Sequence, residues 1–172
     1  MRTVVDAIQA ELQRCKRLGE KAFAQVAADD LTRRSSEDAN SVATLVWHVA
    51  GNLKSRFTDF LSTDGEKPWR DRESEFAART VTPAELSAKW EDGWSALMTA
   101  VEALSEADLA RTVTIRSQPL SVLDALQRSL AHTSYHVGQI VFLSRLLTSG
   151  RWEWLSIPPG QSDEFNRKLR GQ

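Results

Sequence analysis

The three histidines of the chain include a pair whose spacing suits metal coordination. His132 and His136 stand four residues apart in the apolar stretch LAHTSYHVGQI. On a helix, this spacing puts both imidazoles on one face, close enough to share an ion. His48 lies in a second apolar stretch, TLVWHVAGNL. The pair therefore predicts a divalent metal site, and His48 would complete it if its helix faces the pair.

The residues that share a helix face with the histidines are small or polar. At 100° per residue, one face carries Ala125, Ser129, His132, His136 and Gln139. The face around His48 carries Ser41, His48, Asn52, Ser55 and Asp59. A polar line on a core-facing helix is costly unless its groups are satisfied. A metal ion with bound water would satisfy it, and so would ordinary hydrogen bonds to core histidines, so both interpretations stay open.

A three-histidine centre would be able to catalyse a reaction. Neutral imidazoles leave the 2+ charge on the ion and a coordination position open. They suit zinc, nickel and iron(II) alike. Such an ion acidifies bound water, which leads to hydrolysis, or a bound thiol, which leads to thiol transfer. No glutamate stands between His132 and His136 as a general base, and Asp59 lies about 16 Å along its helix from His48. Thiol transfer needs less help from a base, so it is slightly favoured.

Several other polar residues have two interpretations each. Asn52, one turn beyond His48, and Gln139, three residues past His136, would orient a ligand or bind a substrate or cofactor; the alternative is inter-helix hydrogen bonding. Tyr135 is expected to pack rather than to catalyse. Arg56 is expected to be solvated rather than to bind a substrate carboxylate. The loop Lys67–Glu75 has three interpretations: a cover for the site, a cover for a dimer seam, or solvated surface.

The elements that must position these residues are four long helices. Apolar periodicity predicts them over about 3–28, 41–62, 83–104 and 120–148. Ser41 or Asn40, Thr82 with Glu85, and Ser121 are the expected N-caps. A short extended segment is expected within 111–120, and a short helix in the tail at DEFNRKL. We therefore predict an all-α fold, a four-helix bundle with long connecting loops and an irregular C-terminal tail, as a single domain over 1–172.

Composition and charge exclude several classes of protein. The chain has 172 residues and a net charge of −1, without the basic stripe that a nucleic-acid partner requires. It has no apolar run near the ~18 residues of a membrane span and no signal peptide, so no membrane association is expected. The single cysteine, Cys15, continues an apolar series and is expected to be a buried small hydrophobe. These features agree with a cytoplasmic protein.

The histidine stretches resemble a known superfamily. TLVWHVAGN and AHTSYHVGQI are similar to the two histidine motifs of DinB/YfiT-like proteins, and the tail LSIPPGQSDEFN resembles a mostly uncharacterised subgroup of them. The resemblance spans nearly the whole chain. It implies a four-helix bundle, often a homodimer, whose divalent metal ligands are His48, His132 and His136. Known relatives carry out transfer or isomerisation with low-molecular-weight thiols such as mycothiol or bacillithiol, and some are described as metal-dependent hydrolases.

Three hypotheses follow. The first is a metal-dependent enzyme, a thiol transferase with a hydrolase as the alternative, acting on an unidentified small molecule; it predicts an open coordination position facing a pocket. The second is a non-catalytic, stress-related dimer with a structural ion, which predicts a fourth protein ligand and no cavity. The third is a bundle whose histidines bind nothing. Three histidines with no carboxylate or cysteine expected nearby favour the open site.

Overall fold

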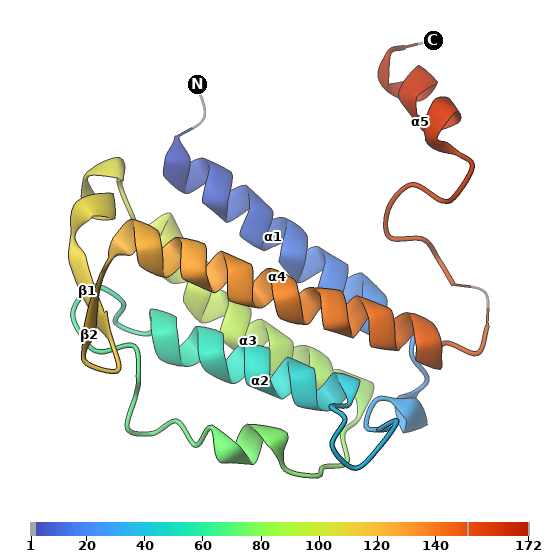
Figure 1. Cartoon of the computed structure of the whole chain (residues 1–172), viewed down its shortest axis with the longest axis horizontal. Helices are drawn as coiled ribbons and strands as arrows, with labels where there is room; N and C mark the ends of the chain where they lie inside the picture. Colours follow the sequence, from blue (N-terminus) through green and yellow to red (C-terminus); the bar gives the residue numbers. More distant parts are fainter. Residues whose placement is uncertain (1–2, 151, 172) are drawn as a thin grey trace.

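Four long helices form an elongated bundle in the computed structural model, which describes residues 3–150 and 152–171. They are α1 (Val4–Phe23), α2 (Val42–Phe57), α3 (Pro83–Glu102) and α4 (Val122–Leu147). Helix α1 packs on α4, α2 packs on α3, and α2 also meets α4 (Figure 1). The predicted all-α bundle is confirmed. No helix among the described residues combines the length and the apolar character needed to cross a membrane.

The beginnings of the helices follow the expected capping chemistry. Ser41 accepts a hydrogen bond from the amide of Thr44, and Ser121 accepts one from the amide of Asp124. Thr82 forms a capping box with Glu85, and Pro83 occupies the first turn. The predicted ends are less accurate: the first helix stops at Phe23, and the second stops at Phe57 rather than near residue 62. The chain turns at Asp59, whose φ is 48°.

Close contacts at two helical glycines constrain the packing of the core. At Gly93 on α3, an added Cβ would collide with the backbone of Ala50 on α2. At Gly19 on α1, it would lie 2.6 Å from an indole carbon of Trp90. Trp90 itself is 1% exposed. Cys15 is buried on α1, as its place in the apolar series predicted. Glycine is therefore needed at both of these close contacts.

A β-hairpin occupies the expected extended segment, at one end of the bundle. Strands β1 (Thr112–Ile115) and β2 (Gln118–Ser121) pair antiparallel, with Ile115 opposite Gln118. Arg116 and Ser117, the two turn residues, have φ of 55° and 59°. This conformation is unfavourable for residues other than glycine or asparagine. The carboxylate of Asp64 accepts hydrogen bonds from both turn amides, at 2.8 and 2.7 Å, and so stabilises it.

The segments outside the bundle differ in how they pack. Three 3₁₀ helices, η1 (Ala28–Asp30), η2 (Glu73–Phe76) and η3 (Glu106–Ala110), lie in the connections. The long connection that contains η2 runs beside α2 (Figure 1). Beyond α4 the tail rises away from the bundle and ends in α5 (Ser162–Leu169), the short helix predicted at DEFNRKL, which has no buried residue. The tail is thus irregular, as predicted.

Replacing Gly93 by alanine tests the close approach of α2 and α3. We expect Gly93→Ala to lower the free energy of unfolding by about 2–3 kcal/mol, because the new Cβ meets backbone that cannot rotate away. Urea denaturation followed by circular dichroism measures this change.

Gly138→Ala on α4 is the matched control. Nothing lies within 4 Å of a Cβ added there. The higher helix propensity of alanine is expected to raise the free energy of unfolding by up to about 1 kcal/mol. Equal effects of the two substitutions would contradict the packing described here.

Candidate metal centre

The structure brings the three histidines together from two helices. His48 lies in the middle of α2, and His132 and His136 lie one turn apart on α4. One ring nitrogen from each histidine lies within 4.8 Å of the others. His48 is buried, and the other two are partly buried. The crossing of α2 and α4 thus supplies the third histidine that the sequence spacing alone could not place.

The distance between two of the ring nitrogens suits either a hydrogen bond or a shared metal ion. Nε2 of His48 lies 3.3 Å from Nε2 of His132. Two imidazole nitrogens this close share either a hydrogen-bonded proton or a metal ion. Tetrahedral zinc with bonds of about 2.05 Å separates its nitrogen ligands by about 3.3 Å. His48 and His132 therefore already have the spacing of two ligands of such an ion, whereas the three nitrogens together lie within 4.8 Å of one another and would have to draw closer.

A buried chain of charged groups orients His48. Its Nδ1–H donates to Oε2 of Glu75, 2.9 Å away. Arg70 donates to both oxygens of that carboxylate, through Nε at 2.8 Å and Nη2 at 3.0 Å. The side chains of Arg70 and Glu75 are only 3% and 6% exposed. Burial alone would raise the pKa of Glu75, but the hydrogen bonds from His48 and Arg70 outweigh it and lower the pKa. Glu75 is therefore ionised, and it fixes Nε2 of His48 as the nitrogen that faces the cluster.

His136 is oriented in the same way by a neutral partner. Its Nδ1 donates to Oε1 of Gln139, 2.8 Å away, and the amide of Gln139 donates to the hydroxyl of Tyr135. The outer nitrogen of His132, Nδ1, is buried without a hydrogen-bond partner among the described residues. Two of the three histidines thus have the hydrogen-bonded outer nitrogen that is usual for metal-bound histidines.

The surroundings of His132 and His136 favour the neutral forms of these two side chains. Burial lowers the pKa of His132 to about 4, assisted by the positive potential of His136, His48, Arg70 and Arg56. Burial also lowers the pKa of His136, although its hydrogen bond to Gln139 opposes the shift. Neutral imidazole is the form that binds a metal ion, so His132 and His136 have the form that a metal ion requires at pH 7.

A cavity of about 200 Å³ opens beside the cluster. His48 and His132 contribute to its wall, and so does Asn52. Ala125 and Ser129, which share the helix face of His132, line it as well. The cavity therefore reaches two of the three histidines, His48 and His132. Asn52 faces this space, whereas Gln139 lies behind His136.

Several expectations for individual residues need correction. Glu75 accepts a hydrogen bond from His48, so the expectation that no carboxylate lies near the histidines is wrong. Arg56 is not solvated: its side chain is 12% exposed, donates to Glu66 and lines the cavity. Tyr135 is 63% exposed and does not pack in the core, although its ring lies 4.8 Å from that of His136. Asp59 lies beyond the end of α2, so it does not continue the face of His48.

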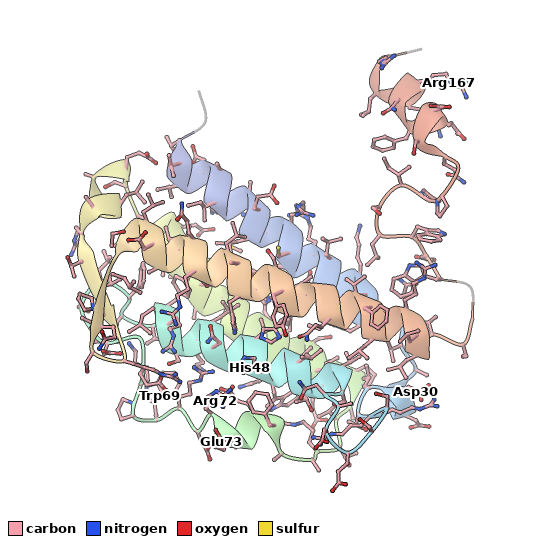
Figure 2. The ribbon with its side chains drawn as sticks, viewed as in Figure 1. Asp30, His48, Trp69, Arg72, Glu73 and Arg167 are labelled. Atoms are coloured by element: carbon pink, nitrogen blue, oxygen red, sulfur yellow. The ribbon has the colours of Figure 1, made fainter. Side chains whose placement is uncertain are left out.

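The loop Lys67–Glu75 contains the residues that sequence reasoning missed. Its mixed charges suggested a cover for the site, a cover for a dimer seam or solvated surface. In the structure this stretch covers the site, because it brings Arg70 and Glu75 against α2; Figure 2 shows Arg72 and Glu73 beside the helix that carries His48. A signal existed at Gly51, where a Cβ would collide with the carboxylate of Glu75. A glycine so close to His48 indicates that another segment approaches the helix there.

The comparisons with known proteins identify a family and a fold. Residues 1–161 match the family described as "Protein of unknown function (DUF1572)". A solved structure from Enterococcus faecalis, titled "Crystal structure of the conserved protein of locus", is similar with a TM-score of 0.66 and 18% identity. The similarity covers 87% of this chain and 100% of that one, and at this identity it supports the fold alone. No curated protein matches the sequence.

The lowered pKa of His132 predicts a stability that falls with acidity. In the metal-free protein, the unfolded chain protonates His132 near pH 6.5, whereas the folded chain does so near pH 4. The contribution of His132 to the free energy of unfolding is therefore fully present above pH 6.5 and is lost as the pH falls from 6.5 to 4. The partly exposed ring limits this contribution to about 1–2 kcal/mol.

His132→Gln removes this titration. Between pH 7.5 and 4.5, we expect the variant to lose about 1–2 kcal/mol less than the parent, measured by urea denaturation in the presence of a chelator. Parallel losses in both proteins would show that burial does not hold His132 neutral.

Proposed function

The chain belongs to the DUF1572 family, and because that description assigns no function, we propose one from the geometry: a divalent metal-dependent enzyme that transfers a low-molecular-weight thiol. The observation that carries the proposal is the cluster of three histidines beside a cavity. His48, His132 and His136 would hold the ion. Its identity would be zinc, nickel or iron(II), since imidazole nitrogens suit all three.

The donor set supports a catalytic centre rather than a structural one. Structural zinc sites usually have four protein ligands. Among the described residues, only these three histidines form a group of potential ligands close enough to share an ion. The carboxylate of Glu75 accepts hydrogen bonds from the outer nitrogen of His48 and from Arg70, so it does not serve as a fourth ligand. The cavity beside the cluster is where a substrate would enter, which the non-catalytic alternative does not require.

The surrounding residues favour thiol transfer over hydrolysis. A bound divalent ion would supply positive charge that lowers the pKa of a thiol or a water molecule. Hydrolysis further needs a base to take a proton from water. No carboxylate lines the cavity among the described residues, and Glu75 is held by its hydrogen bond from His48 and its ion pair with Arg70. In thiol transfer, the thiol loses its proton, its sulfur bonds to an electrophilic carbon, and the leaving group departs with the bonding electrons and is protonated.

The resemblance to DinB/YfiT-like proteins supports the same reaction class. Mycothiol and bacillithiol are the thiols used by known relatives in that superfamily. We place the reaction in the cytoplasm, because low-molecular-weight thiols are kept reduced there. Asn52, which lines the cavity, would bind the thiol or the substrate, and Gln139 would act through His136.

We also propose that two copies of the chain pair through apolar side chains that α4 and the tail leave exposed. Phe142 and Leu146 are 64% and 66% exposed on α4, and Phe165 and Leu169 are 43% and 72% exposed on α5. A second copy would bury both sets. Sedimentation equilibrium is expected to give twice the mass of the chain, 19.3 kDa, and Phe142→Glu with Leu146→Glu is expected to give the monomer mass. A parent protein that sediments as a monomer at 100 μM would rule out the pairing.

Metal content tests the central proposal. Tag-free protein is expected to carry about one equivalent of zinc, nickel or iron by elemental analysis, and the double variant His132→Ala, His136→Ala is expected to carry none. Protein that binds none of these ions even after incubation with them would overturn the proposal. Thiol-transfer and hydrolysis assays of the metal-loaded protein then separate the two reactions.

Two glutamates in η2 provide a matched pair of variants. Glu75→Gln is expected to weaken metal affinity about 10- to 100-fold, because the amide does not supply the charge that makes His48 a stronger ligand. Glu73→Gln removes the same charge two residues away, where the side chain is 85% exposed, and is expected to leave the affinity unchanged. Competition with a zinc-binding dye measures both affinities, and circular dichroism confirms that both variants are folded.

A further inference from the structure

The cavity beside the histidines has an unusual concentration of arginine. Five arginines line it: Arg56, Arg70, Arg72, Arg116 and Arg128. They come from α2, from the loop beside it, from the hairpin turn and from α4. Figure 2 shows Arg72 in the connection beside His48. No acidic residue lines the same cavity in the part of the chain that is described.

Carboxylates outside the cavity compensate only part of this charge. Glu66 accepts from Arg56 at 3.0 Å and from Arg116 at 2.8 Å, so one acid serves two arginines. Glu75 is shared between Arg70 and His48. One carboxylate shared between two donor groups leaves each arginine with N–H groups that can bind another acceptor.

The last two arginines are the most available. Arg72 pairs with Glu73 at the surface, where the two side chains are 45% and 85% exposed, and such a pair is weak in water. Arg128 is exposed on α4 and has no ion-pair or hydrogen-bond partner among the described residues. The five guanidinium groups therefore outnumber the three carboxylates that pair with them, Glu66, Glu73 and Glu75.

The histidine centre does not offset this charge. Neutral imidazoles bring no negative charge, so a bound divalent ion would add its full 2+ to the same space. Low-dielectric walls strengthen such a potential, and the cavity has them: Phe57, Phe60 and Ile115 are buried and line it. The cavity therefore attracts negative charge and offers an apolar surface beside it.

We propose that this cavity binds a small organic anion, whose carboxylate or phosphate group is held by Arg128 and Arg72 and whose apolar part lies against Phe57, Phe60 and Ile115. Guanidinium groups bind either anion through paired hydrogen bonds. A volume of about 200 Å³ is below that of usual drug-sized pockets, so the ligand is small. The inference rests on the proposed function, because this anion would be the substrate of the metal-dependent enzyme.

Binding of simple aromatic anions tests the proposal without knowledge of the substrate. Titration calorimetry would compare phenylacetate, phenylphosphonate and the neutral phenylacetamide, each with metal-loaded and with metal-free protein. We expect at least one anion to bind both forms, and phenylacetamide to bind at least tenfold more weakly. Whether phenylacetate or phenylphosphonate binds more tightly identifies the anionic group.

Arg128→Gln is the decisive variant. It removes the unpaired guanidinium and is expected to weaken anion binding about 10- to 100-fold in both forms. Arg111→Gln is its control, because Arg111 is exposed, pairs with Asp108 and lies outside the cavity, yet carries the same charge. It is expected to change binding less than twofold.

The outcomes separate this inference from the proposed function. Anion binding that requires metal and is unaffected by Arg128→Gln would show that the ion alone holds the anion, and would overturn the inference while leaving the metal centre intact. Equal binding of phenylacetamide and phenylacetate would also overturn it. Arg128-dependent binding in a protein that takes up no metal would support the anion site and contradict the metal-dependent function instead.

Discussion

The hydrogen-bonded chain from His48 through Glu75 to Arg70 is the interaction on which the site depends. It joins the middle of α2 to a loop that has no long helix of its own. Burying these charges is costly, and the cost is offset only because each group satisfies the next. These hydrogen bonds therefore fix the loop in place and determine that Nε2 of His48 faces the other histidines. Without them, the cavity would lack the wall that carries Arg70 and Arg72.

The helices were predictable from the sequence because their signals are local. Apolar periodicity and the caps at Ser41, Thr82 and Ser121 are contained within single segments, and the pair His132 and His136 follows from helical geometry. Helix ends were less predictable, since the turn at Asp59 depends on the segments that follow it. The extended segment near residue 115 was visible as alternation, but its pairing into a hairpin was not.

The rest of the site depends on contacts between distant segments. Glu75 meets His48 across 27 residues of sequence, and Arg116 meets Glu66 across 50. Mixed charges such as those of the loop Lys67–Glu75 are also typical of solvated surface, so charge pattern alone could not reveal burial. Arg56 was misjudged for the same reason. The recurrent error was to treat charged residues as solvated when a second segment covers them.

The carboxylate of Asp64 links the two segments that border the cavity. It holds the hairpin turn at Arg116 and Ser117, while the amide of Gly65 donates to the carbonyl of Thr114 at 2.8 Å. Part of the cavity wall is thus built from loops, whereas the histidines belong to the helices. Insertions or deletions in these loops could reshape that part of the wall without moving the histidines. Such a division would allow descendants of one ancestral bundle to diversify in the molecules they accept while inheriting an unaltered centre.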